Sequence, residues 1–248
     1  MLETESKPVT CYKAPPITEA VVEMHFGDVL SESARKRTSG KVARFYPTEV
    51  QEGLINLQLN PAARKAEFID EDKWLKRATE DQTEILLIKS NVLTWSQLAP
   101  YATWDQFSER IRRDIDVIAV RPRRIVTRIG MRYINRIDIP ASGDSVGQYE
   151  GYLQGGISMP PIIPPPSAYT WHYETRHEDV PCRSVIKSAT VIPIVPNTNA
   201  IMLDIDLIAD VVPARFEEMW ELLQQLRHLK NTLFESIITD KAREIFSS

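Results

Sequence analysis

The segment at 130–140, GMRYINRIDIP, alternates with a period of two between an apolar face and a charged face. Such alternation predicts a strand whose apolar side packs on a core. Asn135 interrupts the apolar face. Because a buried amide needs hydrogen-bond partners, we expect Asn135 to bind backbone near the C-terminal helix and to fix that helix to the sheet. The apolar face carries Met131, Tyr133, Ile137 and Ile139, and the other face carries Arg132, Ile134, Arg136 and Asp138.

Charged residues fall on one side of several other predicted strands as well. In an antiparallel sheet covered by helices on one side, the other side is polar, so a solvated face with cross-strand ion pairs is one interpretation. The second interpretation is a binding site on that face. The candidate residues are Glu19 and Glu23 in the first predicted strand, Arg128, Arg132 and Arg136 in the central one, Lys187, and Asp204 with Asp206 in the last.

Two chemistries suit such a charged face. Arginines hold phosphate or carboxylate groups through their fork geometry, and paired acids such as Asp204 and Asp206 supply oxygen ligands for a divalent metal. Some hydrolases process polyphosphates in tunnels of this kind, but they open with a Glu-x-Glu-x-Lys strand, and the run from Glu19 to Glu23 lacks the lysine. We predict no metal or cofactor outside this alternative. Arg132 and Arg136 are expected to pair with Glu19, Glu23 or an incoming acidic ligand.

The order of the predicted elements indicates an α+β fold with antiparallel or mixed sheets and a long C-terminal helix. Thr103 and Gln106 form a capping box before one helix, and Thr239 with Asp240 suits a break in the last one. Strands are predicted near 17–26, 53–60, 67–78, 83–98 (one strand or two), 124–139, 169–177, 182–194 and 199–210, and helices within 31–47, at 104–119 and at 214–246.

The chain is predicted to form a single domain, 1–248. Strands followed by a helix occur twice, which suggests two pseudo-repeated strand-strand-strand-helix halves at about 12–122 and 123–248. Glycine and proline are concentrated at 140–169, which we interpret as a long loop.

The composition limits the possible partners. The chain of 248 residues has a net charge of −4, so it lacks a general attraction for nucleic acid or an anionic membrane. A basic run at 35–44 keeps RNA binding as a third hypothesis, without a stacking platform to support it. The polar N-terminus, the absence of an apolar stretch of about 18 residues and the two distant cysteines, Cys11 and Cys182, predict a cytoplasmic protein.

Four stretches occur together along most of the chain: APPITEAVVEMHF, SQLAPYATWDQF, GMRYINRIDIP and LKNTLFESIITDKAREIF. On these motifs the chain resembles a sporadically distributed family of prokaryotic proteins of about this length whose function is not established. Its most specific parts are the Arg-Tyr-Ile-Asn-Arg core at 132–136 and the Phe-Glu-x-Ile-Ile-Thr-Asp run at 234–240. The resemblance assigns no catalytic residues. By analogy, it implies an accessory component of a phage-defence, toxin–antitoxin or mobile-element locus.

The sequence contains no glycine-rich phosphate loop and no nucleophile elbow. Together with the acidic balance and the long amphipathic helix, this favours a non-enzymatic binding or regulatory protein that acts through a protein partner. The alternative is a phosphate-ligand sensor or a metal-assisted phosphohydrolase that uses the charged sheet face. A homo-oligomer is compatible with either hypothesis.

Overall fold

The computed structural model describes residues 12–60, 65–118, 125–141, 149, 151–155, 162, 166–210 and 216–247, with side chains described outside 55–60, 65–72 and 216–217. Its strands are β1 (Ile17–Phe26), β2 (Thr48–Asn60), β3 (Lys65–Ala78), β4 (Glu84–Ile88), β5 (Val92–Leu98), β6 (Val126–Pro140), β7 (Thr170–His177), β8 (Cys182–Val191) and β9 (Thr198–Asp210). Its helices are α1 (Glu32–Val42), α2 (Trp104–Ile118), α3 (Phe216–Ile237) and α4 (Asp240–Ser247).

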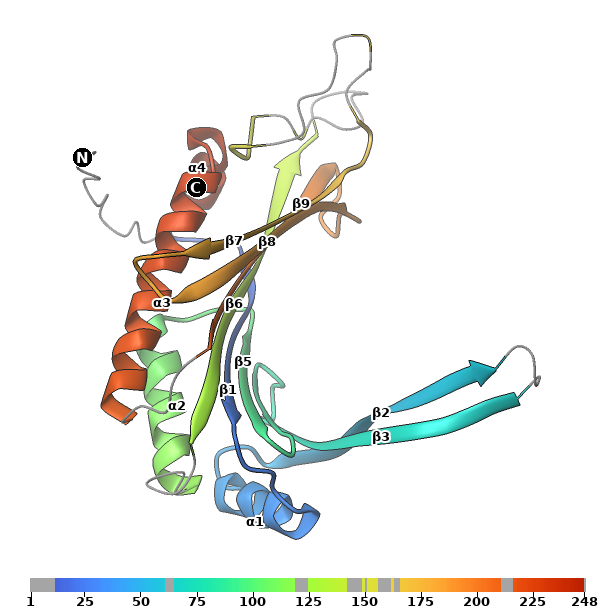
Figure 1. Ribbon diagram of the computed structural model, residues 1–248. Helices are drawn as coiled ribbons and strands as arrows, with labels where there is room; N and C mark the ends of the chain where they lie inside the picture. The colour runs from blue at the N-terminus through green and yellow to red at the C-terminus, as the bar shows by residue number, and fades with distance from the viewer. Residues whose placement is uncertain are drawn as a thin grey trace.

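Within these residues, nine strands form one sheet in the order β2-β3-β4-β5-β1-β6-β9-β8-β7 (Figure 1). Every neighbouring pair is antiparallel, so the predicted α+β class is confirmed and the sheet is not mixed. The run predicted at 83–98 forms two strands, β4 and β5. The pairing of β1 with β6 joins the strands of the first part of the chain to those of the second.

Helices α2 and α3 lie along one face of the sheet (Figure 1). The alternating apolar residues of β6 face them, and Met131 and Tyr133 are almost completely buried. On the helices, Ile111 of α2 and Leu223 and Leu226 of α3 have no exposed surface. The period-two pattern of the strands and the helical stripes therefore meet in one core, which leaves the other face of the sheet free of these helices.

The helix ends follow the predicted caps. The Thr103 hydroxyl accepts a hydrogen bond from the Gln106 backbone at 3.2 Å, and this bond begins α2. The C-terminal helix predicted at 214–246 ends first at Ile237. Thr239 then accepts from the Ala242 backbone at 3.3 Å and begins α4. The first two residues of the predicted helix lie outside the described residues.

Part of the predicted 140–169 loop packs on the junction of α3 and α4. Leu153 forms an isolated bridge with Ile238, and the Thr239 backbone donates to the Tyr152 carbonyl at 3.1 Å. Apart from that bridge and the end of β6 at Pro140, the described residues of this segment form no strand or helix. The remainder of the predicted loop, like the boundary between the predicted halves, lies outside the described residues.

A buried ionic network fixes α2 to the sheet. Asp114 is fully buried, and it accepts hydrogen bonds from Trp95 Nε1 at 3.1 Å, from Arg113 Nε at 2.9 Å and from the Tyr46 hydroxyl. Arg110 is also buried and donates to a β5 carbonyl at 2.9 Å. Because Trp95, Arg113 and Tyr46 donate to the Asp114 carboxylate, its charge is compensated inside the core.

Replacing the buried carboxylate should therefore be costly. We expect Asp114→Ala to lower the free energy of unfolding by about 3–5 kcal/mol, because it leaves Arg113, Tyr46 and Trp95 without their acceptor. Urea denaturation followed by circular dichroism measures the change. Glu109→Ala, which removes an exposed carboxylate of the same helix, is the control and should shift stability by no more than about 0.5 kcal/mol. Equal effects of the two substitutions would contradict the assignment.

Candidate functional site

The register of the central strands brings the predicted charged residues onto one face. Arg132 of β6 lies opposite Val21 of β1 and Asp206 of β9, and Gly130 lies opposite Glu23. The buried side chains that alternate with these residues face α2 and α3, so this charged face is the helix-free face of the sheet. In the next row across the sheet, the same face carries Glu19, Asp204 and Lys187.

Arg132 is bound by a carboxylate of its own sheet. Its Nε and Nη2 donate to the two oxygens of Asp204 at 2.8 and 2.7 Å, in the two-pronged geometry that arginine and carboxylate prefer. Asp204 is buried, whereas the Arg132 side chain is 44% exposed. The hydrogen bonds to Asp204 raise the pKa of Arg132. This pair is the central ionic contact of the charged face.

The two other candidate arginines are also paired. Arg128 Nε donates to Asp210 at 2.7 Å, in a pair that is largely exposed. Arg136 binds Asp138, two residues along the same strand, at 3.0 Å. All three predicted arginines thus meet carboxylates of this chain, which neutralise them.

The acids of β1 have different partners from those predicted. Glu19 accepts a hydrogen bond from the Ser96 hydroxyl at 2.5 Å, and Glu23 accepts from Thr94 at 3.0 Å. Glu23 also lies 3.4 Å from His25 Nε2, and this hydrogen bond lowers the pKa of Glu23. The prediction that the arginines pair with Glu19 or Glu23 is therefore wrong, because β9 presents a carboxylate closer to Arg132 than β1 does.

A small hollow of about 100 Å³ opens at the centre of the charged face. It is lined by Val21, Glu23, Gly130, Arg132 and Asp206. A Cβ at Gly130 would lie 3.6 Å from the Cβ of Glu23 and 3.8 Å from its Oε2, so the Glu23 side chain lies over the glycine. Gly130 is not among the predicted site residues, although a glycine inside a strand pattern signals the close approach of another group.

More acidic than basic side chains line the hollow. Burial raises the pKa of Asp206 to about 6, Arg132 opposes this shift, and Asp204 and Glu23 add to it. Among the described residues that line the hollow, Arg132 is the one cation, and it is already bound to Asp204, whereas Glu23 has hydrogen bonds from His25 and Thr94 outside it. Lys187 is exposed and lies opposite Asp204 in the register. The local excess of carboxylate favours an approaching cationic group over an anion.

Asn135 is buried, and both of its hydrogen-bond acceptors belong to the sheet. Its Nδ2 donates to the carbonyl of Leu203 at 3.1 Å and to that of Tyr133 at 3.4 Å. The predicted bond to backbone near the C-terminal helix is therefore wrong. Asn135 ties β6 to β9, because the adjacent strand offers a carbonyl within reach of its side chain.

The geometry of the charged face gives little support to a phosphate site. Its hollow is smaller than the pockets of about 300–1,000 Å³ that bind small molecules. A phosphate would also have to displace Asp204, Asp210 or Asp138 from an arginine. Among the residues that the structure describes, no group of three His, Cys, Asp or Glu side chains is arranged to hold a metal ion. The phosphate-ligand and phosphohydrolase hypotheses remain predictions.

Several basic side chains of the 35–44 run bind groups of this chain. Lys36 pairs with Glu32 at 2.8 Å, and Lys41 Nζ donates to the Ile118 carbonyl at 3.0 Å. Arg35 donates to a carbonyl of β3. These contacts reduce the charge available to a nucleic acid, and RNA binding stays a prediction.

A scan against protein-family models and a search of curated proteins found no match. The family resemblance based on the four motifs therefore stays a prediction. None of the helices in the described residues combines the length and apolar character needed to cross a membrane.

Removing Arg132 should destabilise the sheet more than removing Arg128. We expect Arg132→Ala to lower the free energy of unfolding by about 2–3 kcal/mol, because buried Asp204 loses its counter-charge. Arg128→Ala, which breaks an exposed pair, should cost less than about 1 kcal/mol. Chemical denaturation of both variants tests the difference, and a larger loss in Arg128→Ala would refute the central place of the Arg132–Asp204 pair.

The raised pKa of Asp206 predicts a specific pH dependence of stability. Its value in the folded chain, about 6, lies above its ordinary value of 3.8, so the folded state binds this proton more tightly than the unfolded state. The resulting stabilisation is complete below about pH 4 and is lost as pH rises through 6. Between these limits, the unfolding free energy of the unaltered chain should fall by about 1 kcal/mol relative to Asp206→Asn, after allowance for solvent screening. Parallel pH profiles of the two proteins would contradict this.

Proposed function

We propose that the protein is a non-enzymatic binding protein that acts through a protein partner. The partner binds the helix-free face of the sheet together with the outer part of the β2–β3 hairpin. The observation that carries this proposal is the hairpin itself, which extends beyond the rest of the sheet (Figure 1).

The outer part of this hairpin, here named the ribbon, comprises residues 52–60 and 65–74. The ladder between β2 and β3 runs from Thr48–Ala78 to Asn60–Lys65, whereas β4 pairs with β3 only from Leu75 to Ala78. Within the described residues, no third strand pairs with the ribbon, and α1 reaches only its base, where Arg35 donates to the Lys73 carbonyl. A two-stranded ribbon is marginal in water, and its open edges offer backbone donors and acceptors to another chain. A bound partner would supply the missing packing.

Two exposed apolar side chains, one at the base of the ribbon and one within it, lie on the same face as the charged residues. Val50, at the base of the ribbon, and Leu54, within it, are 54% and 61% exposed. The register connects Val50 with Glu23 across the sheet through directly opposite residues, and directly opposite residues share a face. The connecting residues are Lys76, Leu87 and Thr94.

This arrangement resembles the surface of a protein interface. Exposed apolar residues on the ribbon adjoin a polar region whose central hollow has an excess of carboxylate. The partner that fits best presents an apolar patch to Val50 and Leu54 and a basic side chain to Glu23 and Asp206. Charge complementarity of this kind speeds association and excludes acidic competitors.

We propose that the protein is a cytoplasmic accessory component of a phage-defence, toxin–antitoxin or mobile-element locus, as the motif resemblance implies. The two halves of the chain are proposed to be pseudo-repeats that end in α2 and in the long C-terminal helix. The strand order supports this, because the first strand of each half, β1 or β6, pairs with the last strand of that half, β5 or β9.

Charge on the ribbon should block the partner. In native mass spectrometry of the chain isolated from its own host, the unaltered protein should carry a stoichiometric protein partner. The double variant Val50→Lys, Leu54→Lys should lose at least about 90% of that complex, because two ammonium groups would be buried at the interface.

The matched control is Val29→Lys, which places the same charge at an apolar residue that is 74% exposed and lies in the turn between β1 and α1. This variant should keep the partner. Isolation of the unaltered chain alone, or retention of the partner by the double variant, would contradict the proposal.

A further inference from the structure

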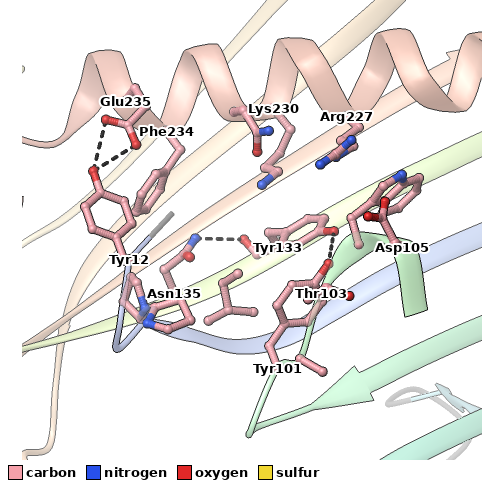
Figure 2. A pocket seen from close by; sticks show the side chains of 16 residues that line it. Tyr12, Tyr101, Thr103, Asp105, Tyr133, Asn135, Arg227, Lys230, Phe234 and Glu235 are labelled. Carbon is pink, nitrogen blue, oxygen red and sulfur yellow. Dashed lines mark hydrogen bonds between the residues drawn. The ribbon is translucent and has the colours of Figure 1, made fainter. Parts of the chain in front are cut away.

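A second cavity, of about 340 Å³, lies on the helix-covered side of the sheet, away from the charged face. Its walls come from residues 12–17, from residues 101–105 at the start of α2, from β6 and from α3 (Figure 2). The volume falls within the range of small-molecule sites and exceeds that of cavities that hold a single benzene. None of the residues predicted as site candidates lines it except Asn135.

Lys230 of α3 lines this cavity with its side chain almost completely buried. It is 8% exposed, and its Nζ lies 3.9 Å from the centre of the Tyr133 ring. Figure 2 shows Lys230 and Arg227 pointing from α3 toward Tyr133. In the described part of the chain, no carboxylate pairs with Lys230 and no acceptor forms a hydrogen bond with its Nζ. A buried ammonium without a counter-ion is unfavourable, so an anion that enters the cavity beside Lys230 would stabilise the charged form of this side chain.

Glu235, the acid of α3 that lines the cavity, already has hydrogen-bond partners. Glu235 accepts the Tyr12 hydroxyl at 2.9 Å and binds Arg243 Nε at 3.1 Å. Two cations, Lys230 and Arg227, and two acids, Asp105 and Glu235, line the cavity, and Glu235 is neutralised by Arg243. With Glu235 neutralised, the two cations outnumber the remaining acid, Asp105, so an anionic group that enters beside Lys230 meets a net attraction.

The other walls are aromatic. Tyr101 and Tyr133 meet edge to face with ring centres 5.7 Å apart, and their hydroxyl groups lie 3.0 Å from each other. Trp104 and Phe234 complete the lining on either side. Rings of this kind contact a flat aromatic ligand through stacked or edge-to-face packing.

We propose that this cavity binds a small monocyclic aromatic carboxylate. The ring of the ligand packs between the aromatic side chains, and its carboxylate pairs with Lys230. The site is independent of the proposed partner surface, because the two lie on opposite sides of the sheet.

The charges around Lys230 define the pH dependence of such binding. Arg227 and Glu235 line the cavity from α3, Tyr133 from β6, Tyr101 from the segment before α2 and Asp105 from the first turn of α2, while Tyr12 binds Glu235. Burial, aided by Arg227 and opposed by Glu235, lowers the pKa of Lys230 from 10.5 to about 7. A carboxylate at Nζ favours the protonated amine, so binding above pH 7 takes up a proton, and affinity falls as pH rises further.

Calorimetric titration with benzoate and with benzamide, its uncharged counterpart, tests the proposal on the unaltered chain. We expect benzoate to bind at least about tenfold more tightly than benzamide at pH 6. At pH 8, the binding heat should differ between phosphate and Tris buffers by the amount expected for uptake of nearly one proton. This measurement uses the unaltered chain, so its result does not depend on whether a variant folds.

Lys230→Met should reduce benzoate binding to the level of benzamide and abolish the proton uptake. Its melting temperature should not fall, because methionine fills the space of the buried stem without a charge. Lys187→Met, on the opposite face, is the matched control and should bind benzoate as the unaltered chain does. Equal affinity for benzoate and benzamide, no binding of benzoate, or unchanged binding in Lys230→Met would each overturn the proposal. Partner binding should persist in Lys230→Met, so failure of this site and failure of the partner surface are distinguishable.

Discussion

The pairing of β1 with β6 is the constraint on which the rest of the structure depends. Within the described residues, it is the ladder that joins the strands of the first part of the chain to those of the second. Since side chains alternate along each strand, this register also decides what each face contains. A slip of one residue would move Arg132 into the core and Tyr133 out of it. The fold, the residues of the charged face and the residues that line the cavity under α3 therefore all depend on the register of β1 against β6.

Most of the elements could be predicted from the sequence, because their signals are local. The period of two in β1, β6 and β9, the change of period at α2, and the caps at Thr103 and Thr239 all depend on neighbouring residues. The alternation in β6 also indicates a buried and a charged face. Composition and spacing are sufficient for such conclusions, since they report which side chains a segment must bury.

The pairing of distant residues could not be predicted, because it depends on register and on packing between elements. Arg132 and Asp204 are 72 positions apart, and only the β6–β9 ladder shows that Asp204, rather than Glu19 or Glu23, binds the arginine. The length of the β2–β3 ribbon follows from where β4 stops pairing with β3. Lys230 looks like an ordinary polar residue of an amphipathic helix. Its burial follows from the packing of α3 over Tyr133. The lack of a carboxylate partner among the described residues follows from the bonds of Glu235 to Tyr12 and Arg243.

The central claim is that the ribbon and the helix-free face of the sheet form a surface for a protein partner. Hydrogen–deuterium exchange, compared between the isolated chain and the complex recovered from the host, tests it most directly. The ribbon amides at 52–60 and 65–74 should exchange rapidly in the isolated chain, since two strands alone protect them weakly, and they should be strongly protected in the complex. Exchange in α3 should be the same in both samples. Protection that appears over α3 and leaves the ribbon unchanged would contradict the claim.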